Sequence, residues 1–145
     1  ENVLVGGEES GGIAVTGHIP ERDGVWVALV LIEAMAKTGK TIKELIAEVY
    51  EVVGPFDYDR YDLHISEEIK QKVIANCKND AYKSFGKYTI ERKEDIDGWK
   101  YFLPDGAWTM IRASGTEPVL RVYGQAKDRV AVIDLLETVK ATLLN

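Results

Sequence analysis

Two arginines and two hydroxyl side chains gather in one short segment near the C-terminal end of the chain. Arg112, Ser114 and Thr116 alternate with other residues, Gly115 separates the two hydroxyl residues, and Arg121 follows. The guanidinium fork of arginine matches the oxygens of a phosphate, while hydroxyls and glycine N–H groups add further donors. The segment therefore predicts a site for an anion such as a phosphate group. The alternative is a capped surface turn whose arginines form ion pairs with nearby glutamates.

A second candidate segment is rich in glycine and follows an apolar stretch at the N-terminal end. Residues 6–12 are Gly-Gly-Glu-Glu-Ser-Gly-Gly. A carboxylate and a hydroxyl on such a loop, Glu8 and Ser10, could bind neighbouring hydroxyls of a sugar. The alternative is a solvated turn. A serine-hydrolase nucleophile is disfavoured, because that motif needs glycine where the chain has Glu8.

His18 is the third candidate, just before Pro20 and a charged run that ends at Gly24. A single histidine near the end of a strand is more often structural than functional, although histidine also binds ligands and moves protons. Both interpretations stay open from spacing alone.

Two helices are predicted in the first third of the chain. Residues 3–5 are typical of the end of a buried strand. Residues 21–38 predict a helix with Asp23 as its N-cap, apolar nearly all round and therefore expected to be buried on several sides. Residues 41–53 predict a second helix, which starts with a capping box of Thr41 and Glu44.

The pattern changes after Gly54-Pro55 and becomes mainly β. Ser66 caps a predicted helix that runs to residue 79, and residues 127–144 predict a final helix with one apolar face. Asp97-Gly98 and Asp105-Gly106 predict tight turns between short strands. The predicted strands are 58–65, 88–92, 99–103, 108–112 and 119–123.

These elements predict an α+β fold with a domain boundary near residue 54. Residues 55–145 are expected to form an antiparallel sheet packed with helices. Residues 1–54 offer one strand for two apolar helices, so they are interpreted as the last strand and helices of a larger α/β domain. The chain starts at Glu1 without Met, and we expect it to be a piece of a longer protein.

Composition narrows the possible partners. The 145 residues are 46% hydrophobic and 29% charged, as in globular proteins, with 18 basic and 24 acidic residues for a net charge of −6. That balance disfavours nucleic acid as a partner. Cys77 is the only cysteine, which excludes an intrachain disulfide and cysteine-based zinc clusters and fits a reducing cytoplasm. The apolar run 25–32 is far shorter than the ~20 residues that span a bilayer, so no membrane partner is expected.

Together the two loops resemble those of the α-D-phosphohexomutase superfamily, the phosphoglucomutase/phosphomannomutase enzymes. Residues 7–11, Gly-Glu-Glu-Ser-Gly, are similar to its sugar-binding loop, and residues 112–118, Arg-Ala-Ser-Gly-Thr-Glu-Pro, are similar to its phosphate-binding loop. The Asp23-Gly24 helix start lies between them. The resemblance covers essentially the whole chain and implies the end of the third and all of the fourth of four domains.

The resemblance also implies an activity for the longer protein. It implies reversible conversion of hexose 1-phosphate and hexose 6-phosphate through a hexose 1,6-bisphosphate, which also serves as activator. A phosphoserine in the first domain and Mg²⁺ in the second would carry out phosphoryl transfer in the cytoplasm. This chain matches neither of those loops, so it would contain no catalytic or metal-binding residue, would need the missing N-terminal domains as partners, and would be inactive alone.

The substrate contacts implied by the resemblance fall on residues already singled out. Glu8 and Ser10 would hold ring hydroxyls, and His18 would lie beside the site. The phosphate that is not reacting would be held by Arg112, Ser114, Gly115 and Thr116, with Arg121 as an addition. Many phosphomannomutase-like members have histidine where this chain has Gly12.

The region around His18 instead resembles the phosphoglucomutases. This resemblance favours a glucose phosphate as the substrate, with a mannose phosphate next. The sequence alone leaves open whether the sugar is glucose, mannose or glucosamine. Two alternatives to a mutase fragment also stay open: a stand-alone, non-enzymatic module that binds phosphosugars or anions, and a purely structural α+β domain.

Overall fold

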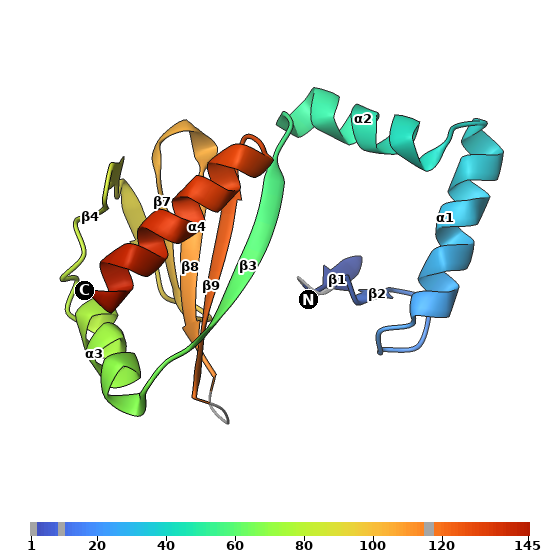
Figure 1. Cartoon of the computed structure of the whole chain (residues 1–145). Helices are drawn as coiled ribbons and strands as arrows, with labels where there is room; N and C mark the ends of the chain where they lie inside the picture. Colours follow the sequence, from blue (N-terminus) through green and yellow to red (C-terminus); the bar gives the residue numbers. More distant parts are fainter. Residues whose placement is uncertain (1–2, 9–10, 115–117) are drawn as a thin grey trace. The chain divides into compact units, whose positions relative to one another are not determined.

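A computed structural model describes residues 3–8, 11–114 and 118–145 of the chain (Figure 1). The chain divides into two compact units, Glu1–Val53 and Gly54–Asn145. The sequence had placed a boundary between residues 54 and 55. No helix among the described residues is both long and apolar enough to cross a membrane.

The first unit consists of a hairpin and two helices (Figure 1). Strand β1 (Val5–Gly7) pairs antiparallel with β2 (Ile13–Val15), and helices α1 (Gly24–Thr38) and α2 (Ile42–Val53) follow. The predicted caps are confirmed, because the Asp23 carboxylate accepts from the N–H of Trp26 at 3.0 Å. The capping box also forms, since the N–H of Thr41 donates to the Glu44 carboxylate at 2.7 Å.

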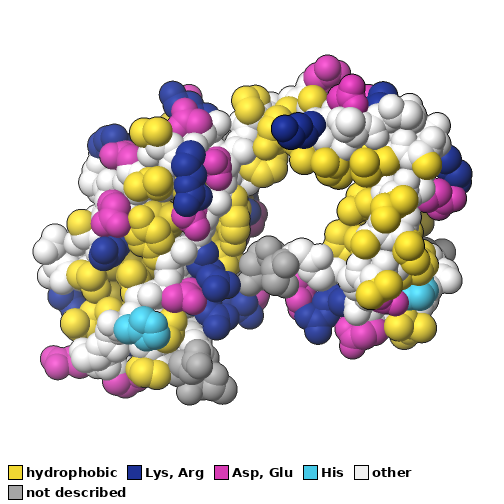
Figure 2. Space-filling view, turned by 45° about the vertical axis from the view of Figure 1, so that its right-hand side comes forward, with side chains coloured by type: hydrophobic (Ala, Val, Ile, Leu, Met, Phe, Trp, Pro, Cys, Tyr) yellow, Lys and Arg dark blue, Asp and Glu magenta, His cyan; other side chains and the backbone are white. Residues whose placement is uncertain are grey.

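The apolar surface of this unit is exposed, as expected if these helices are the end of a larger α/β domain that this chain does not contain. No residue of α1 or α2 is buried, and Val25 and Val52 are 75% and 84% exposed. Residues 3–5, expected to end a buried strand, are exposed as well. Hydrophobic side chains gather over both helices in Figure 2. The physical reason is that two strands of three residues each provide too little sheet to cover two apolar helices.

The second unit is built on a five-stranded antiparallel sheet with helices, which confirms the predicted α+β class. The strand order is β3-β9-β8-β7-β6, and each neighbouring pair is antiparallel. In chain order the strands are β3 (Asp57–His64), β6 (Arg92–Glu94), β7 (Trp99–Phe102), β8 (Trp108–Ala113) and β9 (Val119–Ala126).

Both predicted turns join neighbouring strands of this sheet. Asp97-Gly98 connects β6 to β7, and Gly98 has φ +113°, a value that favours glycine. The residues Pro104–Gly106 connect β7 to β8 as a 3₁₀ turn. These turns show that local sequence was sufficient to predict the hairpins.

One predicted strand, residues 88–92, is divided in the structure. Strand β5 (Tyr88–Thr89) pairs with β4 (Ser84–Phe85) in a separate hairpin, whereas Arg92 opens β6 of the main sheet. The N–H of Ile90 bonds to Lys83 in the small hairpin, but the N–H of Glu91 bonds to Phe102 in the main sheet. The prediction of a single strand was therefore wrong, because the chain changes its pairing partner between these two residues.

Helices α3 (Glu67–Lys78) and α4 (Arg129–Leu144) pack on one face of the five-stranded sheet (Figure 1). The core between them includes Ile111, Leu120 and Val122 from the strands. The helix residues in this core are Val73, Cys77, Val132, Leu135, Leu136, Val139 and Leu143. Because side chains alternate between the faces of a strand, the neighbours of these core strand residues project from the face opposite the helices.

Candidate anion-binding site

Two arginines lie side by side at one end of the sheet, on the face opposite the helices. Arg112 of β8 and Arg121 of β9 are register partners. Directly opposed residues share a face and have Cβ atoms about 5 Å apart, and like charges at such positions destabilise strand pairing. Their side chains are 38% and 33% exposed. A costly arginine pair that is open to solvent indicates a site for an anion.

Carboxylates lie near both arginines and moderate their mutual repulsion. An Oδ atom of Asp97 lies 3.4 Å from Nη2 of Arg112. Asp62, the register partner of Arg121 on β3, approaches its Nε only to 4.0 Å and also pairs with Arg60 at 3.0 Å. The Nε of Arg121 is buried and has no hydrogen-bond partner among the described residues. A donor of this kind is suited to an incoming anion.

A small cavity opens beside the arginine pair. It measures about 120 Å³ and is lined by Arg112, Ala113, Ser114 and Arg121. This is roughly four times the volume of one liquid water, so the cavity suits a phosphate group and is too small for a whole sugar. The Ser114 N–H donates to the carbonyl of Val119 at 3.1 Å and closes the base of the loop between β8 and β9. The predicted contacts Gly115 and Thr116 lie outside the described residues.

Lys70 is a member of this region that sequence reasoning missed. Its Nζ donates to the Ser114 carbonyl at 2.8 Å, and its side chain is only 9% exposed. A signal was present in the sequence: Lys70 precedes the core residues Val73 and Cys77 by three and seven positions, the spacing of one helix face. Helical spacing could therefore have placed Lys70 on the packed side of α3.

The glycine-rich loop of the first unit orients Glu8. The Arg22 guanidinium donates to the Glu8 carboxylate, and this bond raises the pKa of Arg22. A Cβ at Gly12 would lie 2.8 Å from Cδ of Arg22. Gly12 thus leaves room for Arg22 to reach Glu8, a role that the sequence did not reveal. The other predicted contact on this loop, Ser10, lies outside the described residues.

His18 organises the start of α1. Its Nε2 lies 2.9 Å from the Asp23 carboxylate, and its ring stacks on Trp26 with centroids 4.5 Å apart. The pKa of Asp23 is lowered, first by the N–H of Trp26 and then by the bond with His18. The geometry gives His18 a structural role at the helix start. Its predicted place beside a substrate stays a prediction.

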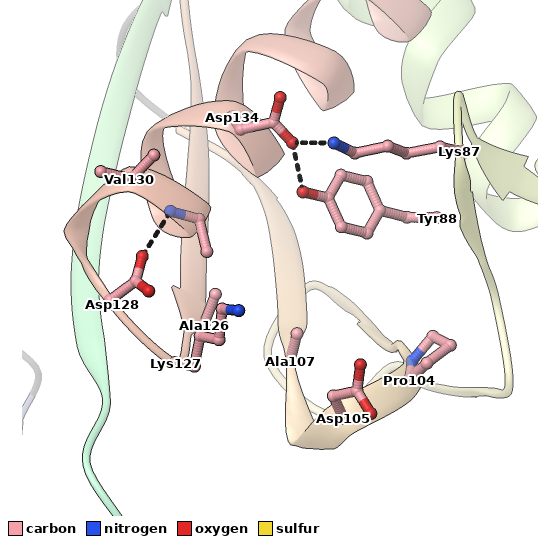
Figure 3. Close-up of a pocket in the computed structure, with 11 residues that line it drawn as sticks. Lys87, Tyr88, Pro104, Asp105, Ala107, Ala126, Lys127, Asp128, Val130 and Asp134 are labelled. Carbon is pink, nitrogen blue, oxygen red and sulfur yellow. Dashed lines mark hydrogen bonds and ion pairs between the residues drawn. The ribbon is translucent and has the colours of Figure 1, made fainter.

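A larger pocket of about 520 Å³ lies at the other end of β8 and β9 (Figure 3). The Lys87 ammonium and the Tyr88 hydroxyl both bind the Asp134 carboxylate, and Asp128 caps the N-terminus of α4. Of the two lysines that line the pocket, Lys87 is already paired with a carboxylate. Three carboxylates, those of Asp105, Asp128 and Asp134, share the lining with these two lysines. This pocket is therefore less suited to a phosphate than the arginine pair, despite its size.

Comparison with known protein families agrees with this geometry. The family model for the C-terminal domain of phosphoglucomutase/phosphomannomutase matches residues 63–141, and the model for alpha/beta/alpha domain III matches residues 1–53. The chain belongs to the phosphoglucomutase/phosphomannomutase family. The part matched by the C-terminal domain model, residues 63–141, contains both arginines, the other cavity-lining residues and Lys70.

The relatives that match within the family are much longer than this chain. The chain is 32% identical to a phosphoglucomutase/phosphomannomutase of Thermococcus kodakarensis over 94% of its own length and 27% of that protein. It is 28% identical to a phosphoglucosamine mutase of Fusobacterium nucleatum, covering 96% of this chain and 27% of the relative. The chain thus spans little more than a quarter of the relatives it matches.

A solved structure of a family member has the same fold. A phosphoglucomutase/phosphomannomutase family protein from Burkholderia thailandensis superposes with a TM-score of 0.66 at 19% identity. The match covers 97% of this chain and 28% of that one. This likeness shows the fold. The predicted resemblance to the C-terminal portion of the family is confirmed by the two family models and the relative from Thermococcus kodakarensis.

Proposed function

We propose that this chain is the part of a phosphohexomutase that recognises the phosphate and hydroxyl groups of a hexose phosphate. The longer protein would interconvert hexose 1-phosphate and hexose 6-phosphate through a hexose 1,6-bisphosphate. The observation that carries the proposal is the opposed pair of Arg112 and Arg121 beside a cavity of phosphate size. Membership of the family supports the reaction class.

The arginines contribute by binding rather than by proton transfer. A guanidinium stays protonated in proteins, so Arg112 and Arg121 supply fixed charge and paired donors to the phosphate that is not reacting. Ser114, Gly115 and Thr116 would add further donors to the same group. Positioning and charge stabilisation dominate phosphoryl transfer, so a binding site of this kind is an effective contribution to the reaction.

The glycine-rich loop would hold the sugar hydroxyls. Glu8 and Ser10 supply an acceptor and a hydroxyl for them. The Arg22 guanidinium holds the Glu8 carboxylate in place, which lowers the entropic cost of orienting it on the sugar. A bisphosphate that turns over in the site must be recognised in two orientations. Contacts to hydroxyls and to an interchangeable phosphate meet that requirement.

The phosphoserine and Mg²⁺ are proposed for the N-terminal domains of the longer protein. The described residues contain no cluster of three or more His, Cys, Asp or Glu suited to a metal ion, so no step is assigned to a metal here. Glucose phosphate is the favoured substrate, mannose phosphate the next, and the phosphoglucosamine mutases among the relatives make glucosamine phosphate a third. The longer protein would act in the cytoplasm.

Titration of the 145-residue chain tests the binding proposal. Inorganic phosphate and glucose 1-phosphate are added separately while amide resonances are followed by ¹H–¹⁵N NMR. We expect saturable shifts of the amides in 112–121, the segment that contains both arginines. Amides of the α4 N-terminal pocket serve as an internal control and should stay in place. Unmoved amides in 112–121 at high phosphate would refute the proposal and favour a purely structural domain.

A coupled assay separates a mutase fragment from other functions. The chain alone, given glucose 1-phosphate, glucose 1,6-bisphosphate and Mg²⁺, should show no turnover above background. Turnover would contradict the fragment interpretation. The stand-alone binding module remains a second candidate, favoured because the unit Gly54–Asn145 holds its own core and the anion cavity. The gene sequence upstream of Glu1 distinguishes these two.

A further inference from the structure

Two more cations lie diagonally beside the opposed pair of Arg112 and Arg121. Lys100 of β7 lies one strand over and two register positions along from Arg112 of β8. Arg60 of β3 stands in the same relation to Arg121 of β9. Diagonal neighbours of this kind have Cβ atoms about 7–8 Å apart. The four residues form a cationic band across the neighbouring strands β3, β9, β8 and β7.

The whole cationic band projects from the open face of the sheet. Tyr101 and Tyr61 pack with the core on the side that the helices cover. Because side chains alternate along a strand, Lys100 and Arg60, which precede these two tyrosines, point to the opposite face. An anion that approaches the arginine pair over the open face therefore passes the two outer cations.

The cationic band is positive although the chain is negative overall. Two carboxylates lie within ion-pair distance of its arginines, those of Asp62 and Asp97. Glu94, opposite Lys100 on β6, is itself bonded to Arg92. Among the described residues the band thus combines four cations with two carboxylates, whereas the chain has a net charge of −6. A local field of one sign concentrates ligands of the opposite sign and speeds their association.

An aromatic platform holds Lys100. Its Nζ lies 4.1 Å from the centre of the Trp108 ring and 5.0 Å from that of the Phe102 ring. Such rings attract an ammonium but do not neutralise its charge. Trp108 stands four positions before Arg112 on β8, so the ammonium leans away from the arginine pair. Lys100 is therefore a charge beside the phosphate cavity and not part of its lining.

We propose that Lys100 is an electrostatic guide for the anionic substrate. Its ammonium attracts the phosphate group over the open face toward Arg112 and Arg121, and it raises the rate of association without binding the phosphate itself. Trp108 and Phe102 keep the ammonium on this face. The inference rests on the proposed function of the arginine pair. It extends the site from the two strands that carry these arginines to β7.

The test measures binding of inorganic phosphate to the 145-residue chain by NMR titration at a low and a high ionic strength. Lys100→Met removes the charge but keeps an apolar side chain over the rings, Lys100→Glu reverses the charge, and Lys100→Arg keeps it. Lys72→Met is the matched control, because it removes the same charge from α3, which covers the other face of the sheet. Line shapes give the association and dissociation rate constants separately.

We expect Lys100→Met to weaken phosphate binding about twofold at an ionic strength of about 0.03 M, where the Debye length is about 17 Å and the ammonium lies about 10 Å from a bound dianion. The loss should lie in the association rate constant, because peripheral charges act mainly on association. At about 1 M, where the Debye length is about 3 Å, it should vanish. Lys100→Glu should weaken binding about fourfold at the low ionic strength, since it changes the charge by twice as much. Lys100→Arg and Lys72→Met should leave binding nearly unchanged.

Two results would overturn the inference. A loss in Lys100→Met that persists at high ionic strength, or that lies in the dissociation rate constant, would show that Lys100 binds the phosphate directly. Equal affinities of the wild-type, Lys100→Met and Lys100→Glu chains at low ionic strength would show that its charge has no effect. Lys100→Gln provides a second neutral variant should Lys100→Met fold poorly.

Failure of the proposed function has a different signature. If the wild-type chain shows no response to phosphate in 112–121, the proposed function fails and the inference for Lys100 fails with it. If the wild-type chain responds and the Lys100 variants bind as it does, the proposed function stands and Lys100 alone is excluded.

Discussion

Replacing the two partners of one ion pair should change phosphate affinity in opposite directions. Arg112→Ala removes a phosphate donor, whereas Asp97→Ala removes the carboxylate that lies 3.4 Å from the same guanidinium. If the cavity binds phosphate, Asp97 competes with the ligand for Arg112. The first change should therefore weaken binding and the second should strengthen it.

The magnitudes follow from the environment of the pair. A charged hydrogen bond contributes about 1.5–3 kcal/mol, or about 10- to 150-fold in affinity. Phosphate must displace Asp97, and Arg112 is 38% exposed, so we expect the lower end, about tenfold. The Asp97 side chain is 72% exposed. Because exposed ion pairs contribute at most about 1 kcal/mol, Asp97→Ala should tighten binding by no more than about fivefold.

Titration of each variant with inorganic phosphate, followed by NMR at fixed ionic strength, measures both effects. In the double variant the benefit of Asp97→Ala should largely disappear, because its target guanidinium is gone. Arg92→Ala is the control: it removes the same charge from β6, where Arg92 pairs with Glu94 and lies over the Phe102 ring. Equal losses in Arg112→Ala and Arg92→Ala, or weaker binding in Asp97→Ala, would refute the reasoning.

Three further predictions concern stability. Burial raises the pKa of the Cys77 thiol from 9.0 to about 11. The folded state therefore holds this proton more tightly than the unfolded state, and the free energy of unfolding should fall as pH rises from 9.0 to about 11. Urea unfolding of Cys77→Ala should show a flatter decline; an identical slope would contradict this. Leu136→Ala should cost about 2–5 kcal/mol through a core cavity, visible in thermal unfolding, and a cost below 1 kcal/mol would argue against tight packing there. Gly98→Ala should cost about 1–3 kcal/mol, since φ is +113° and the new Cβ would lie 2.8 Å from the Ile111 carbonyl; an unchanged urea midpoint would contradict it.

Local features of the fold were predictable from short stretches of sequence. The caps at Asp23 and Ser66 form as predicted, as do the turns at Gly98 and Gly106. The apolar face of α4 is buried as its spacing indicated. These features depend on contacts between residues a few positions apart, which a sequence displays directly.

Features that depend on distant partners were missed or wrong. The strand expected over 88–92 is divided, because pairing to β4 or to β7 is decided by the sheet. The apolar pattern of α1 indicates a surface to be covered, but no residue of α1 is buried by this chain. The bond from Arg22 to the Glu8 carboxylate, and the room that Gly12 leaves for Arg22, became visible only in the folded structure. An amphipathic or apolar pattern predicts that a side chain will be buried, but it does not predict which surface that side chain will pack against.

The sequence by itself determined that donors for an anion gather between residues 112 and 121, and that two loops of a known family are present in order. Only the tertiary structure decided how they are used. The antiparallel register places Arg112 opposite Arg121, the β6–β7 turn brings Asp97 to one of them, and α3 brings Lys70 to the loop. Residue types specify which chemistry is available, but strand register and helix packing fix which charges face one another, because these depend on the burial of the whole core.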